Sequence, residues 1–562
     1  MCGIWAVFGL ATSTSVHSNT SFSKISHRGP DAWRIEHDKR IQNSCIGFHR
    51  LAIVDCIYGM QPMKIHAYPH LTLICNGEIY NCKNLAQQFG FKYETNCDVE
   101  SAIHLFAKGG ISLCARHLDG VFALCIIDSN KRRLYLARDP FGVRPLFRLR
   151  SGSGVLAVSS EAKGLMDMAR DLEGTAWKLE PFPPGVVEAY QIRDDGTTTL
   201  LQSEKYYNIG SKPAAKPFVP YDDFHPTDIH ANIRTLLRSA VRKRLMSDRR
   251  IGCLLSGGLD SSLVTALLVR LAKEEGISYP IQTFSIGMDN SPDIIYARKV
   301  AEYLGTEHHQ VLFTPEDVRQ VLDDVIHTLE TFDITTIRAS VGMYLIARYI
   351  KAHTDSTVIF SGEGADELCE GYIYFRDAPD AQAGAEESLR LLKDIYLYDG
   401  LRVDRTLAAF CLEARVPFLD QQFTHYFMGL PPAMRCPQKG IEKHLLRSAF
   451  DETDLLPKEI LWRHKEAFSD GVTSKKKSLF NVIQDIVESQ VTDNEMAGAS
   501  KKYPHCTPPT KEAYYYRKQF EMQFPNQSHL IPYFWMPRWV TVNDPSARFI
   551  SHYSADSDSA QG

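Results

Sequence analysis

The sequence predicts a layered α+β domain dominated by sheet, followed by an α/β domain with a parallel sheet. Three observations lead to this fold class. Short β-like runs separated by glycine, proline, Asn or Asp fill residues 1–205, whereas strands and helices alternate after residue 229. A proline-containing stretch lies between these regions, and 562 residues are too many for one hydrophobic core.

The amino-terminal region contains the runs "CGIWAVFG", "GFHRLAIVD", "LTLICNGEIY", "GVFALCIID", "RLYLARD", "VLAVSS" and "GVVEAY". Their alternation with turn residues is typical of antiparallel strands. Between them, "DVESAIHLFAKGG" has helical spacing, with Asp98 as the expected N-cap and the glycines as the expected end. We therefore assign a sheet-rich domain to residues 2–205.

The stretch "GSKPAAKPFVPYDDFHPTD" carries four prolines, which places the linker at residues 206–228. Beyond it, "RRIGCLL", "IQTFSIG" and "TVIF" read as strands, and "SSLVTALLVRLAKEEG" and "SPDIIYARKVAEYLG" as helices. This alternation predicts a doubly wound domain over residues 229–540. Residues 541–562 form a tail, and its end, "SADSDSAQG", is expected to be disordered.

The composition is that of a soluble globular protein, with 44% hydrophobic and 23% charged residues. A net charge of −4 gives no electrostatic reason to expect nucleic acid or an anionic membrane as a partner. We find no transmembrane run and no secretory signal. Thirteen scattered cysteines, an odd number without a metal-type spacing, indicate reduced thiols and a cytosolic setting.

Cys2 becomes the terminal residue if the initiator methionine is removed. Its free α-amino group could then act as the general base for its own thiol, so that no separate histidine is needed. The alternative is a cysteine that only fills a buried strand. Position 2, followed by Gly3, favours the nucleophile.

Three further stretches supply what such a nucleophile needs. Arg50 offers a planar fork suited to an α-carboxylate. Asn76 and Gly77 offer an amide and an unhindered backbone N–H for an oxyanion, and Asp98 could pair with an ammonium group. Each also has an ordinary interpretation: a surface ion pair for Arg50, a turn for Asn76-Gly77 and a helix cap for Asp98.

Together with "SHRGPDA" at 26–32, these residues resemble the class II glutamine amidotransferases, whose domain has the four-layer αββα fold of N-terminal nucleophile hydrolases. The resemblance implies that Cys2 attacks the side-chain amide of glutamine, and that Asn76 and Gly77 stabilise the intermediate. The positions that match the glutamine-binding residues of that family are Arg50, Leu51, Ala52, Ile53, Val54, Asn76, Gly77, Glu78 and Asp98.

In the second domain, "LLSGGLDSS" at 254–262 lies between a buried strand and a helix. Its glycines allow backbone N–H groups to surround an anion, and the helix N-terminus adds a partial positive charge. The loop is not a Walker A motif. Asp260 would repel a phosphate, so its presence indicates a magnesium ion between the two.

Two more polar strand ends, "SIG" at 285–287 and "FSGEGADE" at 360–367, are expected at the same carboxyl edge of the sheet. The second supplies Glu363, Asp366 and Glu367, which could bind a metal ion or act as a base. The alternative is that these acids cap the next helix.

The Ser-Gly-Gly-x-Asp-Ser core resembles the pyrophosphate loop of ATP pyrophosphatases. With "SGEGADE", "RASVGMYL", "LEARVPFLD", "GIEKHLLR" and "KEAFSDG", the chain up to about residue 550 resembles the glutamine-hydrolysing asparagine synthetases. This implies synthesis of asparagine from aspartate, ATP and glutamine through a β-aspartyl-AMP intermediate, with glutamate, AMP and pyrophosphate as the other products. Homodimerisation is implied only by the same resemblance.

The resemblance implies that Glu363 assists formation and breakdown of the intermediate and that Asp260 and Asp366 bind Mg²⁺. The residues implied to bind ATP are Leu254, Leu255, Ser256, Gly257, Gly258, Leu259, Asp260, Ser261, Ile286, Ser361, Gly362 and Lys443. A solvated lysine is the alternative for Lys443. Local departures from the family pattern are Cys369-Glu370 and Phe410-Cys411.

Two rival functions remain open at this stage. A synthetase acting on another carboxylate, as in β-lactam-forming relatives, needs no working glutaminase, so the presence of Cys2, Arg50, Asn76 and Asp98 disfavours it. A catalytically silent regulatory protein could lose Cys2 or the loop acids without unfolding, and this chain has both.

Overall fold

The computed structural model describes residues 1–10, 20–172, 174–289, 291–465, 472, 478–542 and 544–545. The chain divides into two compact units. Unit 1 contains Met1–Pro217 and two short returns, Met246–Arg249 and Ala408–Glu413, and unit 2 contains the remainder from Phe218 onward. No sequence feature indicates the returns. The expected disordered end "SADSDSAQG" and residues 466–471 of "KEAFSDG" lie outside the described residues.

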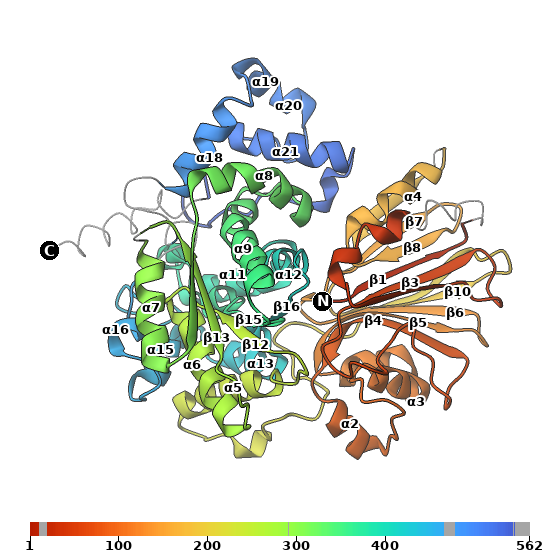
Figure 1. Cartoon of the computed structure of the whole chain (residues 1–562), viewed down its shortest axis with the longest axis horizontal. Helices are drawn as coiled ribbons and strands as arrows, with labels where there is room; N and C mark the ends of the chain where they lie inside the picture. The colour runs from red at the N-terminus through yellow and green to blue at the C-terminus, as the bar shows by residue number, and fades with distance from the viewer. Residues whose placement is uncertain are drawn as a thin grey trace. The chain divides into compact units, whose positions relative to one another are not determined.

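Unit 1 contains two antiparallel sheets (Figure 1). The strand order of the first sheet is β2-β3-β1-β8-β7-β9, and that of the second is β11-β10-β6-β5-β4. The first comprises β1 Gly3–Phe8, β2 Ala32–Glu36, β3 Ser44–Arg50, β7 Phe147–Ser151, β8 Leu156–Ser159 and β9 Trp177–Pro181. The second comprises β4 Leu71–Ile79, β5 Gly120–Asp128, β6 Arg133–Arg138, β10 Val186–Ile192 and β11 Thr198–Lys205.

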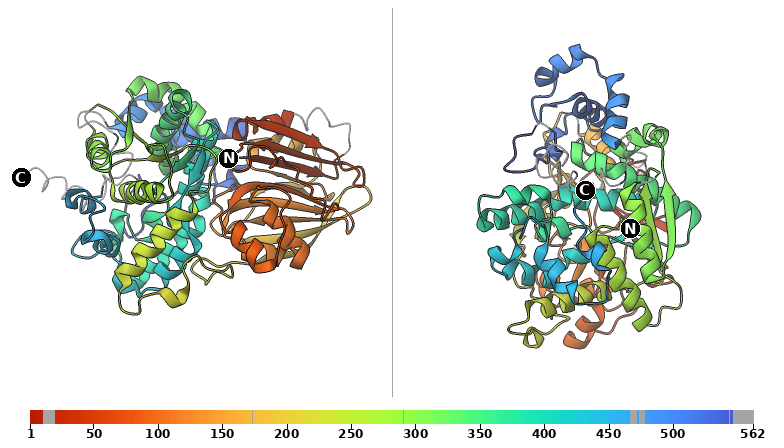
Figure 2. Two further views of the ribbon diagram at one scale, coloured as in Figure 1. Left: turned by 60° about the horizontal axis from the view of Figure 1, so that its bottom comes forward. Right: turned by 90° about the vertical axis from the view of Figure 1, so that its left-hand side faces the viewer.

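The two sheets of unit 1 pack face to face. Alternate side chains of β1 and β3, such as Ile4 and Phe48, share a core with Ile74, Cys125 and Leu136 from the second sheet. Helices α2 Cys82–Phe89 and α3 Glu100–His117 cover the outer face of the second sheet (Figure 2, left). The short helices η2 Ser26–Arg28, η3 Ala162–Gly164 and α4 Met166–Asp171 lie on the outer side of the first. The layers therefore run helix, sheet, sheet, helix.

The start and end of α3 differ from the sequence prediction. Val99 is the N-cap residue, and the Asp98 carboxylate accepts instead from the backbone N–H of Ile79 at 2.5 Å. The helix does not end at its glycines: it kinks at Gly109 and Gly110 and continues to His117. Burial of residues in the second segment, including Ile111, holds it against the sheet in spite of the glycines.

The core of unit 2 is a sheet with the order β14-β13-β12-β15-β16, comprising β12 Ile251–Leu254, β13 Gln282–Gly287, β14 Glu307–Leu312, β15 Val358–Phe360 and β16 Glu413–Arg415. The first four strands are parallel. Helices α6 Leu259–Glu274, α7 Pro292–Leu304 and α9 Ile334–His353 pack against them. This is the strand–helix alternation that the sequence predicts.

Further helices surround this sheet (Figures 1 and 2). They are α5 Ile229–Lys243, α8 Pro315–Leu329, α10 Ala365–Leu368, α11 Ala381–Asp394, α12 Asp399–Ala408, α13 Gln421–Gly429, α14 Pro432–Arg435, α15 His444–Asp451, α16 Lys458–Leu461, α18 Leu479–Glu488, α19 Asp493–Ala497, α20 Ala499–Lys502 and α21 Lys511–Gln523. None of the described helices is both long and apolar enough to cross a lipid bilayer.

Two glycines bring the strand ends of unit 2 close together. Gly257 has φ +73°, and a Cβ there would lie 2.4 Å from the backbone nitrogen of Ala297 on α7. A Cβ on Gly362 would lie 2.9 Å from the Cβ of Asp260. Any larger residue would push the loop after β12 away from α7 or from the end of β15. The carboxyl edge of the sheet is therefore compact enough for one ligand to reach both loops.

Candidate functional sites

Cys2 immediately precedes β1, and β1 is buried along its whole length. The thiol is half-buried, and the backbone N–H of Leu51 donates to Sγ at 3.4 Å. Arg28 donates to the Cys2 carbonyl at 3.0 Å. Sheet pairing and these contacts fix the thiol in place, as the sequence predicts for a strand that begins at position 3.

Burial raises the pKa of the Cys2 thiol to about 11. The Met1 α-amino group is buried too, and desolvation lowers its pKa to about 6. With Met1 in place, the amine belongs to the neighbouring residue and the thiol is neutral at pH 7. Thiolate chemistry at Cys2 therefore needs a base, which a free amine on Cys2 itself would supply.

Asn76 and Gly77 do not form a turn. They lie inside β4, paired with Ala123 and Phe122 of β5. The Asn76 side chain is 1% exposed, and its Nδ2 is a buried donor without a hydrogen-bond partner. Such a group is costly unless a ligand accepts from it. A substrate oxyanion is the kind of acceptor that fits.

Arg50 is the last residue of β3 and is buried, so it is not a surface ion pair. Its guanidinium donates to the backbone carbonyls of Asp55 and of Cys56. Leu51 to Val54 form the loop after the strand, whereas the sequence suggested a continuing strand. The loop turns back over the Arg50 side chain and leaves the Leu51 N–H beside the Cys2 thiol.

Glu78 and Asp98 bring negative charge to the same region. Both carboxylates are buried, and the charge of Glu78 contributes to the raised pKa of Cys2. Burial raises the pKa of Cys75, next to Asn76, and the charges of Asp98 and Glu78 add to that shift. The residues that the sequence singled out in unit 1 thus lie close together. They include an arginine, two buried carboxylates and an amide whose Nδ2 lacks a partner, groups that could bind the two charges and the amide of an amino acid.

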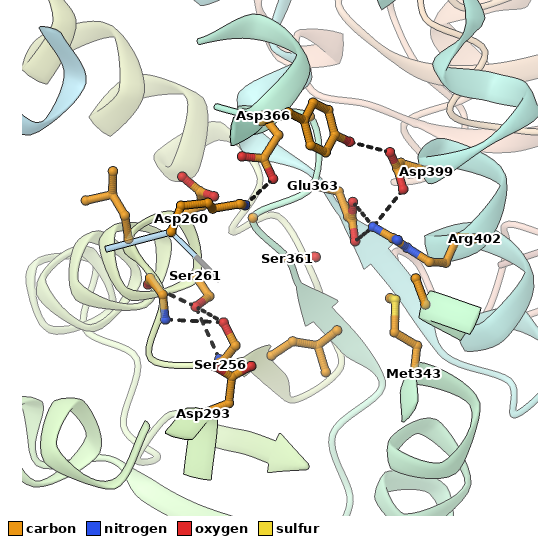
Figure 3. Close-up of a pocket in the computed structure, with 18 of the residues that line it drawn as sticks. Ser256, Asp260, Ser261, Asp293, Met343, Ser361, Glu363, Asp366, Asp399 and Arg402 are labelled. Carbon is orange, nitrogen blue, oxygen red and sulfur yellow. Dashed lines mark hydrogen bonds and ion pairs between the residues drawn. The ribbon is translucent and has the colours of Figure 1, made fainter. Parts of the chain in front are cut away.

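Unit 2 contains a pocket of about 270 Å³ at the carboxyl edge of its sheet (Figure 3). The loop after β12 forms one side of it, with Ser256 and Ser261 hydrogen-bonded to each other at 3.0 Å. Every residue of the predicted ATP set except Gly257 lines this pocket. Gly257 instead makes the tight turn against α7. The apolar portion of the lining includes Leu254, Phe284, Ile286, Met343 and Ile346.

Lys443 lies between the two carboxylates predicted to bind metal. Its Nζ is 2.5 Å from Asp260 Oδ2 and 2.5 Å from Asp366 Oδ1. The side chain is only 2% exposed, so the solvated alternative is wrong. Lys465 contacts the other oxygen of Asp366 at 2.6 Å. The two lysines hold the pKa of Asp366 well below its usual range.

These groups also allow a test of the predicted Mg²⁺ site. The Oδ1 atom of Asp260 is buried without a hydrogen-bond partner. Carboxylate oxygens are the ligands that Mg²⁺ prefers, and it commonly uses one or two of them together with substrate phosphates. The described residues contain no cluster of three or more His, Cys, Asp or Glu side chains that could hold a metal alone. Asp260 fits a phosphate-bound ion, whereas Asp366 could join only if a lysine moved away.

Glu363 lies across the pocket from the Ser256–Ser261 loop (Figure 3). Arg402 Nη2 is 2.9 Å from each of its carboxylate oxygens and 2.8 Å from Asp399. Burial raises the pKa of Glu363 to about 7, although Arg402 opposes the shift. The side chain is therefore poised to exchange a proton near neutral pH.

The acids of "SGEGADE" do not cap the following helix. The N-cap of α10 is Gly364, without a side-chain cap. Glu367 instead accepts from the Tyr372 hydroxyl at 2.7 Å, and the same hydroxyl is 2.7 Å from Asp399. The sequence predicted only part of this end of the pocket, where Glu363 and Glu367 lie. Tyr372, Asp399 and Arg402 also belong to it, but they are in no recognisable motif. Arg338, Ala339 and Met343 of "RASVGMYL" also line the pocket, although the sequence assigned them no role.

The fold and the two sites define a class: a glutamine amidotransferase domain joined to an amide-forming synthetase domain. The profile of the family described as "Glutamine amidotransferase domain" matches residues 1–179. That of the family described as "Asparagine synthase" matches residues 232–390 and 377–542.

Curated relatives identify the family within that class. The asparagine synthetase [glutamine-hydrolyzing] of Cricetulus griseus is 53% identical over 559 residues, with 99% of each chain covered. The enzymes of that name from Gallus gallus and Homo sapiens are 53% and 52% identical at the same coverage. The chain belongs to the glutamine-hydrolysing asparagine synthetase family.

Proposed function

We propose that this chain synthesises asparagine from aspartate and ATP, with glutamine as the nitrogen donor. The observation that carries the proposal is the unit 2 pocket, where an anion-binding loop, Lys443 and Glu363 face one cavity. Family membership and the buried, unpaired Asn76 amide support the glutaminase half. We also propose a cytosolic location, which the thirteen free cysteines support.

In unit 1, the Cys2 thiol attacks the side-chain amide carbon of glutamine after its own amine removes the thiol proton. Asn76 Nδ2 and the Gly77 N–H donate to the oxyanion of the tetrahedral intermediate. The amine returns that proton to the amide nitrogen, which leaves as ammonia, and water then releases glutamate from the thioester and restores the thiol. Arg50 binds the α-carboxylate of glutamine, and Asp98 binds its ammonium group.

In unit 2, a carboxylate oxygen of aspartate attacks the α-phosphorus of ATP, which forms β-aspartyl-AMP and releases pyrophosphate. The backbone of Ser256–Ser261 and Lys443 bind the departing phosphates. Asp260, with Asp366 after lysine movement, would hold Mg²⁺, which when bound neutralises charge on the triphosphate. Leu254, Leu255 and Ile286 contact the adenosine, and Ser361 and Gly362 contact the AMP portion.

Ammonia then attacks the activated carbonyl carbon, and Glu363 takes the proton that the new amide nitrogen loses. Departure of AMP completes the amide. Arg402 keeps Glu363 aimed at the reacting centre, because both carboxylate oxygens face one guanidinium nitrogen. Free ammonia is largely protonated at neutral pH, so direct delivery of nitrogen from glutamine has a chemical advantage.

The test is product analysis with glutamine, ATP and aspartate, for wild type and Cys2→Ala. Wild type should yield asparagine, glutamate, AMP and pyrophosphate in equal amounts. Cys2→Ala should lose the glutamine-dependent reaction and keep synthesis from ammonium. Formation of ADP and phosphate, or loss of both reactions in the variant, would contradict the proposal.

A further inference from the structure

Cys2 precedes the first pairing of β1, so the sheet alone does not fix its backbone. The register with β3 begins at Gly3, opposite His49, and the register with β8 begins at Trp5. The Cys2 carbonyl accepts instead from a side chain, Arg28 Nε, at 3.0 Å. In a chain that begins at Cys2, the amine and the thiol both project from the carbon next to this carbonyl. A group that holds Arg28 therefore also holds the nucleophile.

Arg28 belongs to the motif "SHRGPDA" and is the last residue of η2. This helix lies close to the amino terminus: a Cβ on Gly3 would be 3.2 Å from the carbonyl oxygen of Ile25, the N-cap residue of η2. The Arg28 side chain is 0% exposed. A fully buried guanidinium is costly unless a carboxylate neutralises it, so Arg28 needs an anion as well as the Cys2 carbonyl.

Glu161, which follows β8, supplies that anion. Its Oε1 is 2.7 Å from Arg28 Nη1, and its side chain is 1% exposed. Two further groups contact the same carboxylate: His27 Nε2 is 3.1 Å from Oε1, and Lys163 Nζ is 2.7 Å from Oε2. Charge-assisted contacts of this kind are among the strong hydrogen bonds of proteins. Glu161 therefore joins η2 to the segment after β8.

The backbone around Glu161 is itself fixed to β1. The Ile4 N–H donates to Ser160 Oγ at 3.0 Å, and the Ser160 N–H donates to the Ile4 carbonyl at 3.0 Å. The Trp5 indole N–H donates to the Gly164 carbonyl at 2.9 Å. The Glu161 carboxylate thus projects from a segment that is anchored to the amino-terminal strand on both sides of it.

We propose that Glu161 is a positioning residue for the nucleophile. Through Arg28 it fixes the Cys2 carbonyl, and with it the direction in which the terminal amine faces the thiol. This inference rests on the proposed function, because it takes Cys2 as the nucleophile and its own amine as the base. Arg50 and Asp98, the groups proposed to bind glutamine, have backbone partners of their own. Glu161 then acts on the rate of the chemical step and not on the affinity for glutamine.

The decisive variant is Glu161→Gln, which removes the charge but keeps the size of the side chain. We expect kcat for glutamine hydrolysis to fall about tenfold or more, because a misaligned nucleophile and base lose much of the advantage of proximity. The KM for glutamine and the rate of ammonium-dependent synthesis should stay within about twofold of wild type. The matched control is Asp167→Asn, which breaks an ion pair with Lys24 that also joins the residues around η2 to those after β8, and it should change none of these values.

A second variant separates positioning from folding. Arg28→Lys keeps a positive charge beside Glu161, but one ammonium group does not reproduce the two contacts of the guanidinium. If Glu161 acts through Arg28, Arg28→Lys should lower kcat similarly, and the double variant should lie within about threefold of the more impaired single variant. Effects that multiply in the double variant would overturn the inference. So would an unchanged kcat in Glu161→Gln, an equal loss of ammonium-dependent synthesis, or a rise in KM as large as the fall in kcat.

Hydrogen exchange gives a readout that does not depend on activity. Peptides containing residues 2–8, and those containing Leu51, whose N–H donates to Cys2 Sγ, should exchange faster in Glu161→Gln than in wild type or Asp167→Asn. Exchange in β5, on the other sheet, should be unchanged. Equal exchange in all three proteins would mean that Glu161 does not hold the amino terminus. If wild type hydrolysed no glutamine, the proposed function would fail, while the exchange rates would still test this attachment.

Discussion

Arg402 holds both carboxylate oxygens of Glu363 through a single guanidinium nitrogen, at 2.9 Å each. The two side chains are only 12% and 15% exposed, so solvent screens their attraction less than that of a surface pair. The arrangement orients Glu363 and at the same time limits the rise in its pKa that burial causes. The role of Glu363 can therefore be tested in two ways: by replacing its carboxylate, and by removing the positive charge of Arg402 beside it.

Glu363→Gln should lower the rate of asparagine formation by a factor of about 10² to 10⁴, the usual contribution of a general base, without changing glutamine hydrolysis. Arg402→Gln should shift the rising limb of the pH–rate profile upward from about 7, because loss of the positive charge raises the pKa of Glu363. Both profiles are measured with glutamine as the donor. Arg238→Gln, which breaks an exposed pair with Glu274, serves as the control. An unshifted pH–rate profile in Arg402→Gln would mean that Glu363 is not the general base.

The mature protein should begin at Cys2. The Cys2 thiol is neutral with Met1 attached, since burial raises its pKa to about 11 and, within the described part of the chain, its sulfur hydrogen-bonds only to the backbone of Leu51. Intact-mass measurement should show a chain that lacks one methionine, and glutamine hydrolysis should scale with the processed fraction. A preparation that retains Met1 and hydrolyses glutamine at full rate would exclude the terminal amine as the base.

Asn76→Ala should reduce kcat for glutamine hydrolysis by about 10²- to 10³-fold, as expected for loss of one oxyanion donor, with a much smaller change in KM. Removal of a buried donor that lacks a partner should not destabilise unit 1 strongly. Asn130→Ala, at an exposed position after β5, is the control. A large loss of thermal stability in Asn76→Ala, or an equal loss of ammonium-dependent synthesis, would point to a structural role instead.

The positions of two motifs were predictable, because the residues of each are contiguous in sequence. Cys2 directly precedes a buried strand, and the loop 256–261 follows one and lines the pocket apart from Gly257. In contrast, Trp535 and Arg402 reach the pocket only through tertiary packing, and no local pattern marks them. For Asp98 the local pattern was misleading. An aspartate ahead of a helical run suggests an N-cap, but its carboxylate accepts a hydrogen bond from the buried backbone N–H of Ile79 instead.

Chelation of divalent cations should stop the formation of AMP and asparagine but leave glutamine hydrolysis at Cys2 intact, because only unit 2 is proposed to need Mg²⁺. Asp260→Asn should raise the Mg²⁺ concentration for half-maximal synthesis by about tenfold or more, since a charged ligand is lost. Asp454→Asn, an exposed partner of Arg270, is the control. An unchanged Mg²⁺ requirement in Asp260→Asn would exclude Asp260 as a ligand.

The stability of unit 2 should depend on pH through Asp333, the N-cap of α9. Its carboxylate is buried and accepts from Thr336 N at 2.9 Å and from Trp535 N at 2.7 Å. Desolvation nevertheless raises its pKa from 3.8 to about 6. Because the folded state binds this proton more tightly than the unfolded state, the contribution of Asp333 to stability is full below about pH 4 and is lost as pH rises through 6.

Relative to Asp333→Asn, which cannot titrate, wild type should therefore lose about 1 to 2 kcal/mol in free energy of unfolding between pH 5 and pH 7.5. The variant should be less stable overall, because an amide cannot accept at both positions, so the informative quantity is the pH slope from denaturant unfolding. Asp228→Asn alters the N-cap of α5, where a partly exposed carboxylate has a pKa lowered by its hydrogen bond from the Ala231 N–H, and should show no such difference in this range. Parallel pH dependences for wild type and Asp333→Asn would mean that Asp333 stays ionised when the protein is folded. The Trp535 N–H would then donate to a charged carboxylate rather than to one that gains a proton near pH 6.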